Sequence, residues 1–93
     1  MKIIECLWQE QFIEKLERKH RVSTDEVEEV FGNAPRYDFI AKGRAGGENV
    51  YRALGRTAGR YLAVFFIYKR DRKALPISAR DMDGKERKRY GKE

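Results

Sequence analysis

The sequence predicts an α+β fold, in which an antiparallel sheet carries two N-terminal helices on one face and is followed by a short C-terminal helix. Two stretches with helical periodicity come first, before residue 34. Strand-like segments then follow one another between residues 36 and 78, and their short connections require antiparallel neighbours. A chain of 93 residues can bury one small core, so we expect a single domain over residues 1–93.

The stretch from Tyr61 to Tyr68 is predicted to be the central strand of this sheet. It contains no charge and no turn former, and it is rich in aromatic and β-branched residues. It is too short to cross a membrane. Both of its alternating sets of side chains are apolar, so both faces of the strand should be covered and Phe65 should be buried.

The N-terminal part begins with a weak strand signal over residues 2–7. Trp8, Phe12 and Leu16 then recur every four residues, which is typical of a helix with one apolar stripe. This pattern predicts a first helix of about three turns.

A second helix is indicated by a capping box, in which Ser23 and Glu26 each accept a hydrogen bond from the backbone amide of the other. Val22 and Val27 flank this box and are placed to pack together across it. The helix should end at Gly32, because Asn33 and a proline follow shortly after it.

The remaining strands are expected at residues 36–41, 50–54 and 74–78, with a hairpin connection over residues 42–49. Pro76 cannot donate a backbone hydrogen bond, so the last strand should lie at an edge or carry a bulge there. A second capping box, Asp83 to Glu86, predicts a C-terminal helix that continues through Tyr90.

Charge is distributed unevenly along the chain, whose formal net charge is +6. Residues 60–93 contain 11 Lys and Arg against 5 Asp and Glu, whereas residues 1–33 contain 5 against 8. A basic side of this kind is typical of proteins that bind a polyanion. The alternative, that these are ordinary solvated side chains, is equally compatible with the charge pattern.

The residues available for chemistry are few. One His and one Cys give no zinc-binding spacing, so no metal and no cofactor is expected, and Cys6 is more typical of a core residue than of a nucleophile. A single thiol and the absence of a signal-peptide pattern favour the cytoplasm. His20 lies between Lys19 and Arg21, cations that favour a neutral imidazole able to act as a base; the alternative is a helix-terminal His that interacts with the last carbonyl groups.

The C-terminal stretch from Ile77 to Tyr90 resembles the end of the BrnT toxin family, in which Ile-Ser-Ala-Arg is followed by a helix with Glu-Arg and, three residues later, Tyr. Further motifs agree in order and spacing over nearly the whole chain. They are Trp8, Lys19-His20, Val22-Ser23, Val30-Phe31-Gly32 and Gly55-Arg56-Thr57.

This resemblance implies a RelE-like ribonuclease, the toxin of a bacterial type II toxin–antitoxin system. Such an enzyme would cleave RNA without a metal ion, through attack of a ribose 2′-hydroxyl on its own phosphate, which requires a base and cations around the phosphate. The resemblance makes His20 the candidate base and Arg80 the candidate phosphate clamp, and the other candidates are grouped by role. Lys19, Arg52, Arg56, Arg60 and Arg87 would contact RNA, and Glu86 and Tyr90 would orient the site.

The implied partners are RNA and a ribbon-helix-helix antitoxin, in a homo-oligomer or a toxin–antitoxin hetero-oligomer, with no membrane. Asn49 and Val50 stand where the family pattern has Glu-Arg, and Arg52 is a candidate to supply the missing cation. The alternative is therefore a catalytically inactive domain that binds RNA or an antitoxin and has a regulatory role.

Overall fold

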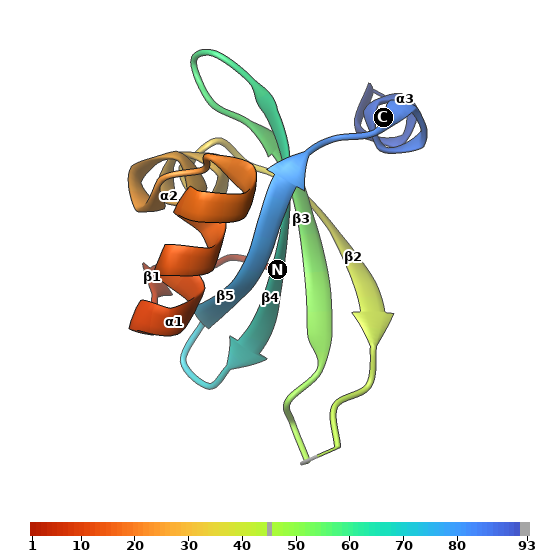
Figure 1. Cartoon of the computed structure of the whole chain (residues 1–93). Coiled ribbons are helices and arrows are strands. Elements are labelled where there is room, and N and C mark those ends of the chain that lie inside the picture. The colour runs from red at the N-terminus through yellow and green to blue at the C-terminus, as the bar shows by residue number, and fades with distance from the viewer. Residues whose placement is uncertain (45, 92–93) are drawn as a thin grey trace.

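A five-stranded mixed sheet is the centre of the computed structural model, which describes residues 1–44 and 46–91 (Figure 1). Residue 45 of the predicted hairpin connection and residues 92–93 of the predicted domain lie outside the described residues. The strands are β1 (Glu5–Cys6), β2 (Arg36–Ala41), β3 (Val50–Arg56), β4 (Tyr61–Lys69) and β5 (Lys73–Asp81), in the spatial order β1-β5-β4-β3-β2. The helices are α1 (Glu10–Lys15), the π-helical turn η1 (Leu16–His20), α2 (Thr24–Gly32) and α3 (Gly84–Gly91).

The prediction of an entirely antiparallel sheet is wrong at one edge. Strands β2 to β5 are antiparallel neighbours, but β1 pairs in parallel with β5, with Glu5 opposite Lys73 and Cys6 opposite Ala74. Two backbone hydrogen bonds extend this pairing, from the amide of Ile4 to Arg72 and from the amide of Leu7 to Ala74. Short connections impose antiparallel pairing only among β2–β5, because β1 is followed by a long crossover that contains the helices.

Strand β4 is central in the sheet, as predicted, but its two faces are covered unequally. Leu62, Val64 and Phe66 are fully buried in the core that α2 and η1 form with the sheet. The opposite face is covered mainly by α3, which lies apart from the other helices (Figure 1). The prediction that Phe65 is buried is wrong: it points to this second face and is partly exposed.

Local signals place the elements as expected in most of the chain. The capping box of α2 is present, with hydrogen bonds of 3.1 Å in each direction between Ser23 and Glu26. Val22 and Val27 beside it are fully buried. The first helix changes to a π-helical turn at Leu16, and the chain leaves it at Arg21, whose φ of 53° is left-handed.

Strand β5 extends further than the pattern predicts, to Asp81. The bulge predicted at Pro76 is confirmed: Phe65 opposes Ser78 but Phe66 opposes Pro76, so Ile77 has no partner residue on β4. The bulge matters for the site, because it re-aims the residues after it. Among the described residues, no helix is long and apolar enough to cross a membrane.

Candidate active site

The antiparallel register places two rows of side chains on the face of the sheet that α3 covers. One row is Asp38, Arg52, Phe65 and Ser78, which are directly opposite one another across β2, β3, β4 and β5. The next row is Arg36, Leu54, Ala63 and Arg80. Because alternate residues of a strand share a face, the charged members of both rows lie under or beside α3.

Arg80 and Glu86 form the centre of this face. The Nη1 and Nη2 atoms of Arg80 donate to the two carboxylate oxygens of Glu86 over 2.6 Å and 2.9 Å. The Glu86 side chain is only 4% exposed, whereas that of Arg80 is 38% exposed. Hydrogen bonding to Glu86 raises the pKa of Arg80, so its positive charge is permanent.

The helix itself fixes Glu86 in place. The predicted second capping box is present: the amide of Glu86 donates to Asp83 over 2.8 Å, and the amide of Asp83 donates to Glu86 over 2.9 Å. A carboxylate in the first turn of a helix also interacts favourably with the helix dipole. Glu86 therefore both caps the start of α3 and binds the guanidinium of Arg80.

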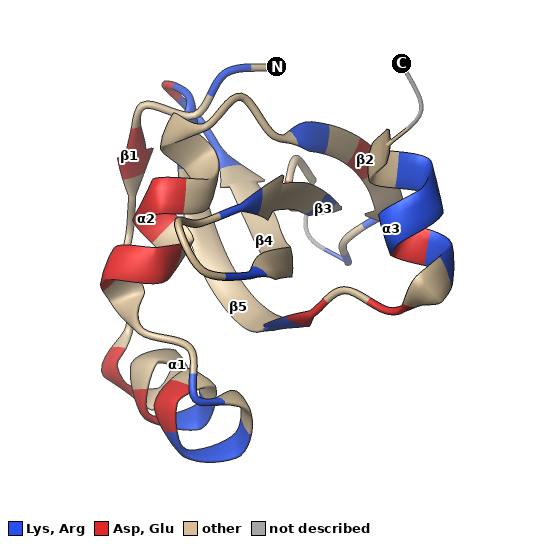
Figure 2. Ribbon diagram, turned by 90° about the horizontal axis from the view of Figure 1, so that it is seen from above, with Lys and Arg blue, Asp and Glu red and all other residues tan. Residues whose placement is uncertain are grey.

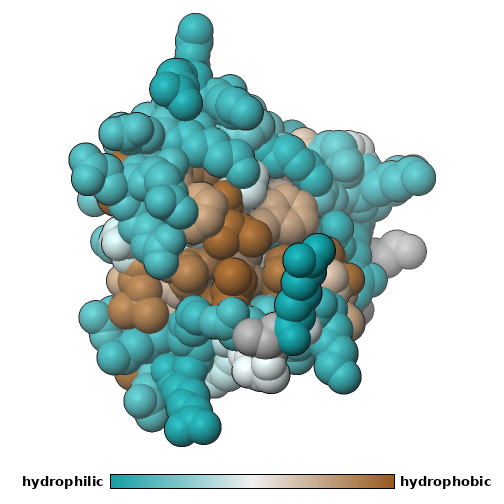
Figure 3. Space-filling model, turned by 60° about the horizontal axis from the view of Figure 1, so that its bottom comes forward, coloured by the Kyte–Doolittle hydropathy of each residue, from teal (hydrophilic) through white to brown (hydrophobic). Residues whose placement is uncertain are grey.

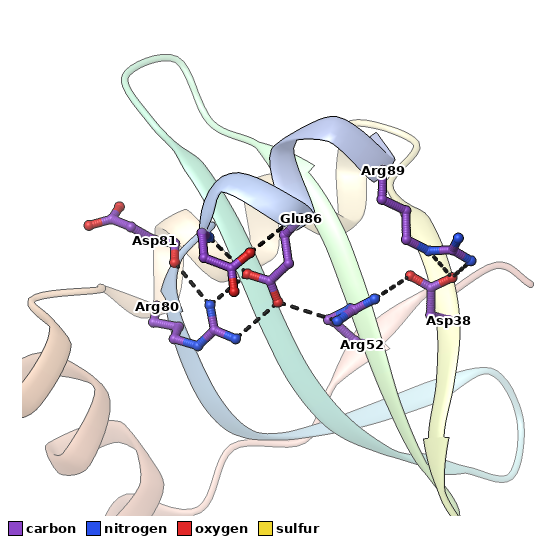
Figure 4. A network of polar contacts seen from close by, with 7 residues as sticks. Asp38, Arg52, Arg80, Asp81, Glu86 and Arg89 are labelled. Carbon is purple, nitrogen blue, oxygen red and sulfur yellow. Dashed lines mark hydrogen bonds and ion pairs between the residues drawn. The ribbon is translucent and has the colours of Figure 1, made fainter. Parts of the chain in front are cut away.

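Arg52 continues the network across the sheet (Figure 4). Its Nη1 donates to Glu86 over 3.3 Å and its Nη2 to Asp38 over 3.0 Å. Arg89 of α3 donates to Asp38 from its Nε over 2.9 Å. Hydrogen bonds from Arg89 and Arg52 lower the pKa of Asp38 to about 2, against the cost of desolvation, so this carboxylate is ionised at neutral pH.

The charged groups of this network are well paired, but one hydrogen-bond donor of Arg52 remains unused among the described residues. The Nε of Arg52 is buried and has no hydrogen-bond partner among the described residues.

The guanidinium of Arg80 lies over the ring of Phe65, with 5.4 Å between its Cζ and the ring centroid. Val50 and Ile67 oppose each other on the same face beyond Phe65. The molecule shows an apolar area framed by polar side chains when its bottom comes forward (Figure 3).

His20 and Lys19 are not part of this network. Both lie at the end of η1, and no hydrogen bond within the described residues joins His20 to Arg80 or Glu86. One side chain nevertheless connects the two regions: Arg60 donates to the carbonyl of Arg21 over 2.8 Å and to Asp81 over 3.0 Å. Arg21, which follows His20, and Asp81, which follows Arg80, therefore both accept a hydrogen bond from the guanidinium of Arg60.

The other predicted RNA-binding residues lie at the end of the sheet where β3 and β4 join. Arg56 and Tyr90 line a polar hollow of about 570 Å³ together with Thr57. Tyr90 also packs edge-on against Tyr61, over whose ring the guanidinium of Arg87 lies at 4.2 Å. The structure therefore brings Arg56, Arg87 and Tyr90 into one neighbourhood around Tyr61.

Sequence reasoning missed Asp38 and Arg89, which complete the network. A signal for Asp38 was present, because the alternation of Tyr37 and Phe39 puts Asp38 on the other face of its strand. Its partners follow from strand register and from the position of α3, which a local pattern does not contain. In the part of the chain that the structure describes, no three His, Cys, Asp or Glu side chains come together as a metal site.

A comparison with known protein families found one match that covers most of the chain. The family model described as "Ribonuclease toxin, BrnT, of type II toxin-antitoxin system" matches residues 8–86. The matched region runs from Trp8 to Glu86 and so includes every strand from β2 to β5 and the start of α3. No curated protein sequence matches the chain. Since the match covers most of its length, the chain belongs to the BrnT family of ribonuclease toxins of type II toxin–antitoxin systems.

Proposed function

We propose that the protein is an endoribonuclease that cleaves RNA at the face of the sheet covered by α3, without a metal ion. The observation that carries this proposal is the Arg80–Glu86 pair: a permanently charged guanidinium is held by a buried carboxylate while 38% of its side chain remains exposed. A cation fixed in this way needs no reorganisation when negative charge develops on a phosphate.

The proposed reaction is internal transfer of the phosphodiester. The ribose 2′-oxygen bonds to phosphorus, a base takes its proton, the bond from phosphorus to the 5′-oxygen breaks, and that oxygen receives a proton. The products are a 2′,3′-cyclic phosphate and a 5′-hydroxyl. In this scheme Arg80 contacts the phosphate oxygens, Glu86 orients Arg80, and Arg52 adds positive charge from a nearby strand.

His20 is the proposed base. Support comes from its position at the end of η1, which packs against β5, and from Arg60, which ties the segments after His20 and after Arg80 together. Since η1 packs on the other face of the sheet from α3, the RNA would pass from Arg80 around the end of β5 to reach the partly exposed side chain of His20. Lys19 would contact the same RNA next to it.

We also propose that three arginines contact the RNA backbone, namely Arg56, Arg60 and Arg87. Tyr90 would keep Arg56 in position. Arg60 has a structural role as well, because its hydrogen bonds to Asp81 and Arg21 connect β5 with the end of η1. We propose a cytoplasmic toxin whose activity is neutralised by a ribbon-helix-helix antitoxin.

Incubation of purified protein with a single-stranded RNA, with and without a chelator, tests the proposal. We expect cleavage that the chelator does not reduce, fragments that carry 2′,3′-cyclic phosphate, and a rate that falls sharply for Arg80→Ala. A matched control is Arg70→Ala in the turn between β4 and β5, which carries an exposed cation at the other end of β5. Fragments with 5′-phosphate ends, or activity that requires added metal, would show that the proposed mechanism is wrong.

A further inference from the structure

A second group of cations, apart from the Arg80 pair, lies where α3 approaches the start of β2. Four basic side chains, Arg36, Lys85, Lys88 and Arg89, line a hollow of about 220 Å³ between the start of β2 and α3. Figure 2 shows α3, with its Lys and Arg residues in blue, beside β2.

The three basic side chains that α3 contributes to this hollow lie close to one another. Lys88 and Arg89 follow Lys85 by three and four residues, so both lie on the same side of the helix as Lys85 and repel it. The nearby carboxylate of Asp38 is bound by both Arg89 and Arg52. Lys85 and Lys88 are exposed, so these two positive charges face solvent.

The register connects this hollow to the proposed cleavage site. Arg36 belongs to the same cross-strand row as Arg80, with Leu54 and Ala63 between them. Neighbouring strands are about 4.8 Å apart, so the two arginines are separated by three strand spacings, or roughly 14 Å. A nucleic acid strand that runs along α3 can therefore meet Arg80 at one side of the helix and the hollow at the other.

We propose that the hollow lined by Arg36, Lys85, Lys88 and Arg89 binds a backbone phosphate of single-stranded RNA, a few nucleotides away from the phosphate held at Arg80. The choice of RNA rests on the proposed function. The chemistry that recognises the ligand is charge and hydrogen bonding to a phosphodiester, without reading of the base. Such a site would make a long RNA bind better than a dinucleotide while the chemical step stays the same.

The test is the salt dependence of binding to a 2′-O-methyl oligoribonucleotide long enough to cross the sheet, which the proposed reaction cannot cleave. Each phosphate neutralised on a single strand contributes a slope of about 0.7 in log K against log salt. The double variant Lys85→Gln/Lys88→Gln should therefore lower the slope by about 0.7, the contribution of one phosphate, and weaken binding at low salt. The matched control is Arg70→Gln/Arg72→Gln in the turn between β4 and β5, which removes two exposed cations far from α3 and should leave the slope unchanged.

Cleavage assays separate this inference from the proposed function. With a long RNA, Lys85→Gln/Lys88→Gln should raise KM and leave kcat unchanged, and with a dinucleotide it should change neither. A wild-type protein that cleaves RNA while the double variant keeps the full salt slope would overturn the inference alone. The inference also fails if the double variant binds RNA normally but is no longer inhibited by its antitoxin, because the hollow would then be a protein-binding surface. A wild-type protein that cleaves no RNA counts against the proposed function, whatever the slope.

Discussion

Arg80 and Glu86 are only six residues apart, yet they join two different elements: Arg80 lies near the end of β5 and Glu86 in the first turn of α3. Two hydrogen bonds, of 2.6 Å and 2.9 Å, connect them. The position of the helix on the sheet and the direction of the guanidinium are therefore set by the same contact. A change that loosens α3 should disturb the proposed phosphate clamp at the same time.

Glu86→Gln is expected to lower both stability and cleavage. The amide keeps the shape of the side chain but removes the charge that Arg80 and Arg52 share, and hydrogen bonds to charged groups contribute about 1.5–3 kcal/mol each. Denaturation in urea measures the loss of stability, and single-turnover cleavage measures the loss of activity. Asp83→Asn is the matched control, since Asn is as good an N-cap as Asp and Asp83 has no hydrogen bond to either arginine among the described residues. Equal stability of the two variants would contradict the role given to Glu86.

Arg80→Lys should behave almost like Arg80→Ala in cleavage. A lysine keeps the positive charge but cannot donate to Glu86 and to a phosphate in the planar geometry of a guanidinium. We expect both variants to cleave about a hundredfold more slowly or worse, with little change in RNA binding, because the contact strengthens mainly in the transition state. Single-turnover rates and direct binding measurements decide this, and a fully active Arg80→Lys would mean that charge alone suffices.

Asp38 should make stability depend on pH in the acid range. Its pKa is about 2 in the folded protein against an ordinary 3.8, since Arg89 and Arg52 donate to it. A carboxylate with a lowered pKa stabilises the fold above its unfolded pKa, and this contribution disappears as pH falls from about 4 towards 2. After allowance for solvent screening, we expect a loss of about 1–2 kcal/mol over that range. Urea midpoints measured against pH should show it in the wild type and not in Asp38→Asn.

Phe66 and Phe65 are neighbours in β4 but should differ strongly in their effect on stability. Phe66 is fully buried among Phe31, Tyr37 and Tyr51, so Phe66→Ala should cost about 3–5 kcal/mol. Phe65 is partly exposed beneath Arg80, so Phe65→Ala should cost clearly less. Thermal or urea denaturation of both variants provides the comparison. Similar losses would mean that α3 covers Phe65 more fully than its partial exposure indicates.

This pair also shows where sequence reasoning stops. The apolar run predicted the central strand correctly, because eight such residues in a row must be largely buried. The same run could not say which face has the better cover, since that depends on how far a short helix such as α3 extends over the sheet. The capping boxes at Ser23 and Asp83 were predictable because they are local. The contacts of Asp38 were not, because they join β2, β3 and α3.

His20→Ala is the last prediction, and it tests the proposed base directly. Loss of a general base typically slows a reaction by about 10²- to 10⁴-fold, so single-turnover cleavage should fall by that amount while RNA binding is kept. Lys19→Ala is the matched control: it removes a neighbouring exposed side chain at the same end of η1 and should weaken RNA binding more than it slows the chemical step. His20 is partly exposed and its side chain makes no hydrogen bond within the described residues, so neither variant should unfold the domain. If His20→Ala cleaves RNA at the wild-type rate while Arg80→Ala does not, the site on the α3 face stands and its base must be sought among the groups that surround Arg80.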